Sequence, residues 1–357
     1  MKISKLVLLF TVVFLIMTSC GREEKAGNPV LYPESEVVSE IEPVPRLKIL
    51  KDEKGRLTLF YQSKGLYKAV FDKKWSYLSV TDVVGDIRDG WSTVLCGGRI
   101  RLIAEGVDDH LYLIDNNGGS FKKFRIGRNR FSSLGVESDA VCDESEVLHF
   151  VVYDPLTEVL FYYSEKDKFQ GEDVVQGIEI SSPHVRVTYS GRVYVAYIDK
   201  DKDHVMLAFK DPGSKWQIED TGFQGDMLSF EISAYGADLA SVYPRVAVRT
   251  VDRRGIVVGY RKQNGWEKRK INFDHYISDP IYFATGSQEG VVVQDTYWED
   301  LDIAVYDGYQ WRVGNIVSAG ATGYAPSIFV DDDKLYTAYY SMDTGGIYVV
   351  EVKLPWH

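Results

Sequence analysis

The segment AFKDPGSKW, residues 208–216, combines a short apolar run, a polar turn and one aromatic residue. The same order recurs six more times along the chain, as AVFDKKW, LIDNNGGSF, FYYSEKDKF, GYRKQNGW, AVYDGYQW and VVEVKLPW. The spacing of 45 to 50 residues is typical of β-propeller blades, and helical solenoid repeats are shorter. We therefore predict an all-β, seven-bladed β-propeller. We expect the aromatic residues that end the segments to be buried between blades; they are Trp75, Phe121, Phe169, Trp216, Trp266, Trp311 and Trp356.

Each repeat predicts four strands, and the aromatic residue opens the outermost one. In the fourth repeat the strands are expected at 184–188, 192–198, 205–209 and 216–219. In the fifth, counting back from Trp266 gives strands at 228–234, 245–250 and 256–261 and avoids an improbably long loop. The seventh repeat has only three strands, at 327–330, 335–340 and 347–352. We predict that residues 36–41 supply its missing outer strand and close the ring, which removes exposed sheet edges.

Composition limits the class of partner. The 357 residues include 41 Lys and Arg against 52 Asp and Glu, a net charge of -11, which argues against a nucleic-acid binder. Hydrophobic residues make up 45% and charged residues 26%, so the chain can bury a core. The 24 Tyr and 31 Gly favour short strands and tight turns over helices.

The N-terminus has the features of an export signal. Lys2 and Lys5 precede an apolar run at residues 6–17, which is too short for a comfortable membrane span. The run ends in MTSCG, which resembles the bacterial lipobox, and the resemblance implies lipidation of Cys20 by acyl chains. The alternative is a signal-anchor helix with a chance cysteine.

The lipobox resemblance also implies a cellular location and a set of domain boundaries. Residues 1–19 are expected to be a lipoprotein signal peptide, 20–35 the lipidated cysteine and a flexible tether, and 36–357 the propeller. Gly21 is similar to the residue that follows the lipidated cysteine in lipoproteins sent to the outer membrane. We expect a bacterial cell-envelope protein held by its lipid, with the membrane leaflet left open.

Two further cysteines, Cys96 and Cys142, leave two alternatives open. An exported protein meets oxidising conditions that permit a disulfide. Bridging requires Cα atoms within about 7 Å, however, so we favour two separately buried thiols.

The turn before the repeat aromatic resembles a degenerate Asp-box motif of the sialidase-like and lectin-like propellers. Asp211, Gly213 and Trp216 keep its core, and LIDNNGGSF keeps a weaker version in Asn116, Gly118 and Phe121. The resemblance implies the propeller fold and a structural role for the turn. It implies no catalytic activity for this chain.

A sialidase-type site would need an arginine cluster, a Tyr–Glu nucleophile pair and an acid–base Asp in the channel. The family's Arg-Ile-Pro pattern is absent, since proline precedes arginine at Arg46 and Arg245. We therefore expect Arg46, Arg186 and Arg245 to be hydrogen-bond donors between blades. The chain also lacks CxxC and GxSxG motifs and phosphate-binding glycine loops.

No metal or cofactor is expected. The alternating acids at 199–203 resemble a calcium loop, but His204 and Lys210 stand where Gly and Glu are required. The six histidines show no paired metal-ligand spacing.

Binding residues are expected on the face that carries the turns between second and third strands and the connections between blades. The best candidate is the turn of Tyr297, Trp298, Glu299 and Asp300, because adjacent exposed aromatics stack on sugars or hold peptides. The second is Trp91 with Arg88 and Asp89 in another connection. An equally good interpretation is that these rings only cover the shoulder of the propeller.

These observations predict a lipid-anchored, non-enzymatic scaffold that binds a protein or a glycan. The alternative function is a sialidase-like or other carbohydrate-active surface enzyme.

Overall fold

The computed structural model describes residues 30–31, 35–39, 46–88, 90–117, 120–131, 136–234, 242–285, 288–318 and 320–354. The predicted signal peptide, Cys20, Asp89, Gly118 and Trp356 lie outside these ranges. Within them no helix has the length and apolar character that a membrane crossing needs.

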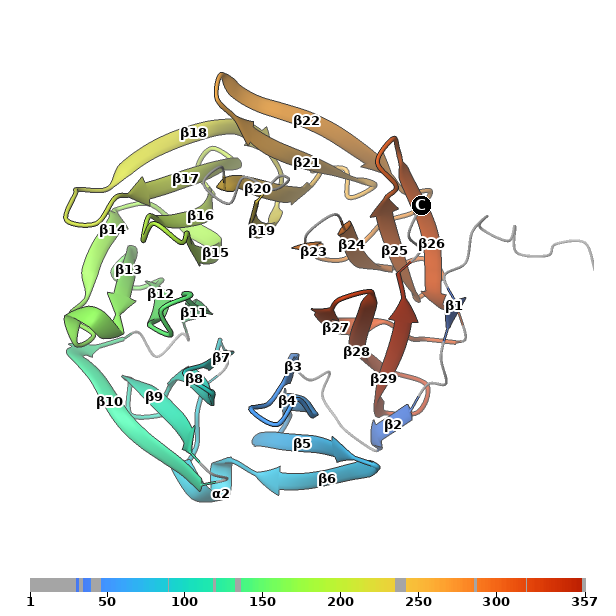
Figure 1. Cartoon of the computed structure of the whole chain (residues 1–357), viewed down its shortest axis with the longest axis horizontal. Helices are drawn as coiled ribbons and strands as arrows, with labels where there is room; N and C mark the ends of the chain where they lie inside the picture. Colours follow the sequence, from blue (N-terminus) through green and yellow to red (C-terminus); the bar gives the residue numbers. More distant parts are fainter. Residues whose placement is uncertain are drawn as a thin grey trace, which may run out of the picture.

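Seven antiparallel sheets surround a central channel, and each sheet is one blade whose strands run in chain order from the channel outward (Figure 1). Blade 1 consists of β3 (Arg46–Lys51), β4 (Leu57–Gln62), β5 (Leu66–Asp72) and β6 (Lys74–Ser79), followed by α2 (Thr81–Val84). Blade 2 consists of β7 (Ser92–Cys96), β8 (Arg99–Glu105), β9 (His110–Asn117) and β10 (Ser120–Arg130). Blade 3 consists of β11 (Glu137–Cys142), β12 (Leu148–Asp154), β13 (Val159–Ser164), the short helix η1 (Glu165–Asp167) and β14 (Glu172–Gln176).

The next three blades repeat the plan. Blade 4 consists of β15 (Ile180–Val187), β16 (Val193–Asp199), β17 (His204–Lys210) and β18 (Gln217–Gln224). Blade 5 consists of β19 (Met227–Ala234), β20 (Val242–Arg249), β21 (Gly255–Lys262) and β22 (Gly265–Asn272). Blade 6 consists of β23 (Ile281–Thr285), β24 (Gln288–Asp295), β25 (Asp300–Tyr306) and β26 (Trp311–Val317). The strands predicted for the fourth and fifth repeats overlap these observed strands.

Blade 7 is completed by the N-terminal part of the chain. Its own strands are β27 (Tyr324–Asp331), β28 (Lys334–Ser341) and β29 (Gly346–Lys353). The outer position is taken by β2 (Ser35–Val38), which pairs antiparallel with β29, and by β1 (Val30–Leu31), which pairs with the end of β29. The predicted closure of the ring is confirmed. β1 lies in the stretch expected to be tether, so the paired segment starts earlier than predicted.

Apolar side chains pack between neighbouring blades. Seven buried clusters occur in the described residues, and each joins two adjacent sheets, including blades 7 and 1. The second strands β12, β16 and β24 are buried at every residue because sheets cover both of their faces. This explains the apolar runs of β12 and β16, where a half-exposed strand would alternate, whereas β24 also buries Gln288, Glu289, Gln294 and Asp295.

The repeat aromatics lie at these interfaces but are less buried than predicted. Trp75, Phe121, Phe169, Trp216, Trp266 and Trp311 each pack against the cluster shared with the preceding blade. Among these six, only Phe121 is fully buried. The others stay half-buried because they sit at the outer edge of the blade, where solvent covers one side of the ring.

The Asp-box-like turns are only partly as expected. Gly213 has a φ of +75°, as the motif requires, but Asp211 pairs with Arg192 at 2.7 and 2.8 Å. In blade 6, Asp307 accepts hydrogen bonds from the backbone N–H groups of Tyr309 and Gln310, both at 2.9 Å. The turn in AVYDGYQW therefore keeps the motif's hydrogen bonding better than its sequence indicated.

A ring of buried polar residues marks the end of every second strand. They are Gln62, Glu105, Asp154, Asp199, Arg249, Asp295 and Ser341, and none is more than 9% exposed. The three aspartates hold the following turn by accepting backbone N–H groups at 2.9 to 3.2 Å, from Leu156, Asp201 and Tyr297. Asp199 thus acts as a turn cap, which accounts for the calcium-loop-like run without a metal.

Candidate functional site

The channel holds a cavity of about 430 Å³ to which all seven inner strands contribute. Successive side chains of an inner strand point toward the two neighbouring blades, as Ser138 does toward Ser92 and Asp139 toward Val185, so residues of adjacent blades meet around the channel. The walls combine the buried Trp91 with a group of charged and polar side chains: Arg46, Lys48, Asp139, His184, Arg186 and Glu231.

Arg186 joins three neighbouring blades in this cavity. Its Nη1 lies 2.8 Å from Oδ2 of Asp139 on β11, and its Nη2 and Nε lie 2.6 and 3.0 Å from the two carboxylate oxygens of Glu231 on β19. Burial by itself would raise the pKa of Asp139, but Arg186 and His184 outweigh it and hold this pKa below its usual value. Asp139 is therefore ionised, and Arg186 binds both carboxylates in the wall of the cavity.

Lys48 and Arg46 lie two residues apart on β3 and share its channel face. Burial lowers the pKa of Lys48, while the carboxylates of Asp139 and Glu231 act in the opposite direction. The Lys48 ammonium has no hydrogen-bond or ion-pair partner within the described part of the chain. The Arg46 guanidinium carbon lies 5.8 Å from the centre of the Trp91 ring. A basic pair beside the buried Trp91 thus shares the cavity with the Arg186 network.

Local backbone distortions help to place the polar residues. Ser182 has a φ of 51° in a bulge of β15, immediately before Pro183 and His184. The Ser182 N–H donates a 2.7 Å hydrogen bond to Oε2 of Glu137 on β11. Burial raises the pKa of Glu137. Ala325, with a φ of 48°, forms a similar bulge in β27. Such bulges redirect the following side chains, and they are common beside functional sites.

The predicted turn between β24 and β25 is partly open. Tyr297 and Trp298 are 64% and 43% exposed, with ring centres 4.9 Å apart. His275 stacks on Tyr297 at 4.6 Å with the planes 8° apart. Asp295 fixes the turn by accepting the Tyr297 and Trp298 N–H groups. The face therefore carries an aromatic cluster of His275, Tyr297 and Trp298.

The two acids of that turn have structural partners. Oε1 of Glu299 accepts a 2.8 Å hydrogen bond from the Tyr324 hydroxyl of blade 7. Asp300 is buried, and its Oδ2 accepts a 3.2 Å hydrogen bond from Asn315. They hold the turn in place, so the exposed contact surface consists of the aromatic rings.

The second predicted contact is not on the open face. Trp91 is 1% exposed and packs in the cluster between blades 1 and 2, so its placement as an exposed ring is wrong. Arg88 contacts Asp109 at 2.8 Å and Glu105 at 3.5 Å. The buried indole instead contributes to the wall of the channel cavity, below the guanidinium of Arg46.

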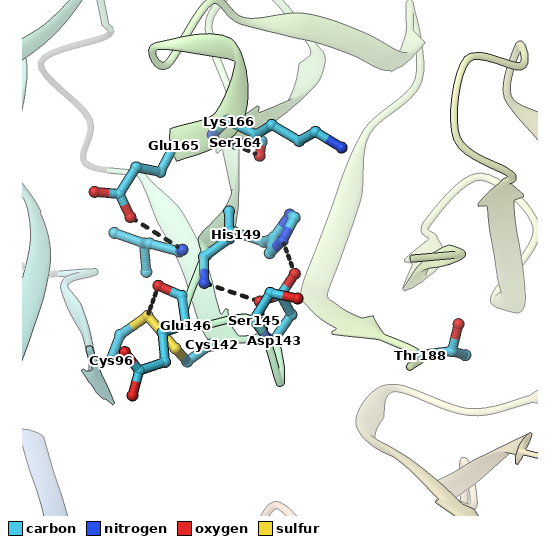
Figure 2. A network of polar contacts seen from close by, with 12 residues as sticks. Cys96, Cys142, Asp143, Ser145, Glu146, His149, Ser164, Glu165, Lys166 and Thr188 are labelled. Atoms are coloured by element: carbon cyan, nitrogen blue, oxygen red, sulfur yellow. Dashed lines mark hydrogen bonds and ion pairs between the residues drawn. A yellow bond between two sulfur atoms is a disulfide. The ribbon is translucent and has the colours of Figure 1, made fainter. Parts of the chain in front are cut away.

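Cys96 and Cys142 form a disulfide, with Cα atoms 5.2 Å apart. The preferred interpretation of two separate thiols is therefore wrong, because each cysteine ends the inner strand of its blade and the two blades are neighbours. Figure 2 shows the bond beside the turn of Asp143, whose carboxylate accepts the Ser145 N–H at 2.9 Å and contacts His149 at 3.1 Å.

The expected inter-blade roles of two arginines are confirmed. Arg186 links blades 3, 4 and 5, and Arg245 on β20 lies 3.2 Å from Glu289 on β24. The sequence analysis did not single out Lys48, Asp139 or Glu231. The available signal was the alternation of polar pairs in the inner strands, as in Arg46 with Lys48 and Glu137 with Asp139.

A Tyr–Glu arrangement exists, but away from solvent. The hydroxyls of Tyr260 and Tyr282 donate to Oε1 of Glu289 at 2.5 and 2.8 Å, beside Arg245. All four side chains are buried, and burial raises the pKa of Tyr282 well above its usual value. An activated phenolic nucleophile needs a lowered pKa and access to substrate, so this cluster is structural.

No protein-family model and no curated protein matches the sequence. Solved structures do match its fold. The lectin SapL1, in complex with α-methyl fucoside, shares 13% identity over 79% of this chain and 99% of its own, with a TM-score of 0.55. The fucose-specific lectin of Aleuria aurantia shares 14% over 80% and 99%, with a TM-score of 0.51. An oligogalacturonate lyase in complex with manganese shares 12% over 92% and 98%, with a TM-score of 0.55. At these identities the likeness shows the propeller fold alone.

Proposed function

We propose that this protein is a lipid-anchored envelope scaffold that binds a glycan in its channel without transforming it. The observation that carries the proposal is the cavity in which Lys48 faces the Arg186–Asp139–Glu231 network. Its volume of about 430 Å³ is in the range of small-molecule sites. Fixed donors and acceptors suit hydroxyl-rich sugars, and the two lectins among the structural neighbours support a glycan.

The charge arrangement favours binding over hydrolysis. Glycosidases need a carboxylic acid that holds a proton near neutral pH and a second, ionised carboxylate. Asp139 and Glu231 both form ion pairs with Arg186, and the pKa of Asp139 is held below its usual value, so Asp139 is not the proton-holding acid. Their geometry instead gives a rigid, fully paired wall.

Binding is tested with Lys48→Met, which removes a channel-facing charge that has no hydrogen-bond or ion-pair partner in the described part of the chain. The matched control is Lys54→Met in the exposed turn after β3. A glycan array followed by calorimetry should find a ligand whose affinity falls at least about tenfold in Lys48→Met, the loss of one charged hydrogen bond, and is unchanged in Lys54→Met. Equal affinities of the parent and Lys48→Met would show that the glycan binds outside the channel. The absence of any bound glycan would contradict the proposal.

A carbohydrate-active enzyme is the second candidate, and Glu137 is the observation in its favour. Glu137 lies two residues before Asp139 on the same face of β11, and their pKa values are displaced in opposite directions. Such a pair is the pattern of an acid and a base. Hydrolysis of aryl glycosides that disappears in Glu137→Gln, with binding retained, would favour this function.

The anchor is proposed from the lipobox-like segment at Cys20. The Cys20→Ala variant should accumulate as an unlipidated precursor and leave the membrane fraction, since the acyl chains provide the attachment. We place the mature protein in a bacterial envelope, at the outer membrane. A Cys20→Ala protein that stays with membranes after a high-salt wash would contradict the lipid anchor.

A further inference from the structure

The outer edge of blades 1 and 2 exposes an unusual share of large apolar side chains. Five of them are between 37% and 55% exposed on β5, β6, α2 and β10: Phe71, Tyr77, Leu78, Val83 and Phe124. We call these five residues and the exposed basic residues among them, Lys73, Lys74, Lys122 and Arg125, the rim patch. In Figure 1 these elements form one continuous arc of the ring.

The charge of these two blades is opposite to that of the remaining ring. Residues 46–131 contain 17 Lys and Arg against 10 Asp and Glu, a balance of +7. Residues 132–357 contain 20 against 36, a balance of -16. Blades 1 and 2 therefore face an anionic surface favourably, while the other five blades are repelled by it.

The N-terminal part of the chain reaches this arc after it has crossed the outside of blade 7, where β1 pairs with the end of β29. β2 lies on the outside of blade 7, and the Tyr77 hydroxyl of β6 donates a hydrogen bond to the Val37 carbonyl of β2. Only nine residues lie between Cys20 and Val30. Even when fully extended, this segment places Cys20 about 35 Å from Val30 at most. A lipid at Cys20 thus keeps the outer edge of blade 7, where Val30 pairs with Lys353, close to the bilayer.

We propose that the rim patch docks on the anionic headgroups of the membrane that holds the lipid. This inference rests on the proposed anchor. Exposed aromatic and aliphatic rings beside lysines match the composition of interfacial membrane contacts, where apolar groups enter the boundary and cations pair with phosphates. The ring then lies edge-on, so both of its faces remain accessible and the membrane does not cover the channel.

The test uses the full lipidated protein on two kinds of vesicle, phosphatidylcholine alone and phosphatidylcholine with phosphatidylglycerol. Lysine acetylation rates are read by mass spectrometry. Lys74 and Lys122 should react about fivefold more slowly on the anionic vesicles, the factor expected for a lysine at a charged surface. High salt should restore the rates by screening. Lys215 and Lys270, exposed on the far side of the ring, serve as internal controls and should not change.

A pair of variants sharpens the assignment. Lys74→Glu/Lys122→Glu should abolish the protection of Lys73, and Lys215→Glu/Lys270→Glu, with the same charge change, should keep it. Equal acetylation rates on both vesicles would overturn the docking. Protection that depends on protein density and not on lipid charge would also overturn it, in favour of contact with a second copy of the chain.

The lipid anchor and the docking of the rim patch are measured by separate experiments. Flotation with vesicles after a high-salt wash reports the anchor, and the acetylation pattern at low salt reports the docking. A chain that is washed off by salt but still shows low-salt protection on anionic vesicles would refute the anchor and retain the docking. A chain that fails to float even at low salt would refute both.

Discussion

Two tryptophans of blade 6 have different surroundings. Trp311 packs against the cluster between blades 5 and 6, and Trp298 projects from the face beside His275 and Tyr297. Trp311→Ala should destabilise the fold by about 2 to 3 kcal/mol, somewhat below the usual cost for a fully buried ring, because it is half-buried. Trp298→Ala should stay within about 0.5 kcal/mol of the parent.

Chemical denaturation of both variants compares their free energies of unfolding. Calorimetric titration of a bound partner compares their affinities. If Trp298→Ala unfolds as easily as Trp311→Ala, the aromatic cluster belongs to the core. In that case it is not a binding surface.

Glu105 gives the fold a dependence on pH. It is fully buried, its nearest cation is Arg88 at 3.5 Å, and burial raises its pKa to about 7 from 4.5. Because the folded protein then holds this proton more tightly than the unfolded chain, stability should fall as pH rises from 4.5 to about 7. Urea unfolding across this range should show that decline, and Glu105→Gln should make the curve flatter. An unchanged slope in Glu105→Gln would assign the dependence to other groups.

At the scale of single elements, the disulfide fixes the ends of β7 and β11 to each other. It closes a loop with a sequence separation of 46 residues, for which the chain-entropy model gives about 4 kcal/mol. The Cys96→Ala/Cys142→Ala protein should therefore melt at a lower temperature than the oxidised parent. The parent under reducing conditions should resemble the variant. Identical melting of all three would show that the bond contributes nothing to the folded ring.

The elements were largely predictable because the repeat is local. An apolar run, a turn and an aromatic residue define each hairpin, so strands in blades 4, 5 and 7 could be placed from their own sequence. The disulfide was missed although its separation of 46 residues equals one repeat, so both cysteines occupy the same position in neighbouring blades. Comparing equivalent positions across repeats would have paired them.

The site was less predictable, for a physical reason. Alternation shows that Arg46 and Lys48, or Glu137 and Asp139, share a face of their strand. It does not show that inner strands far apart in sequence bring Asp139 and Glu231 within hydrogen-bond distance of Arg186 and line one cavity with Lys48. The exposed turn at Tyr297 could be found because its residues are contiguous, whereas the cavity is assembled from separate blades.

For the whole molecule, ring closure depends on the strand pair β2–β29. A chain lacking residues 21–29 should be as stable as the parent, whereas one lacking 21–39 exposes β29 and the cluster around Val37. The second deletion should cost at least about 2 kcal/mol, roughly the burial of one valine. Thermal melting of the two truncated chains measures this difference in stability. Equal melting temperatures would show that β2 is dispensable.

The same pairing fixes an order of events in time. β2 is synthesised before blades 1 to 6, and its partner β29 is synthesised after them. Blades 1 to 6 contain all their own strands and can form as they appear, but blade 7 is complete only once β29 has been made. Until then β2 is unpaired, and the contact that closes the ring spans a large sequence separation, which makes it intrinsically slow. A chain cut short before β29 leaves an open ring with an unprotected edge, which favours aggregation.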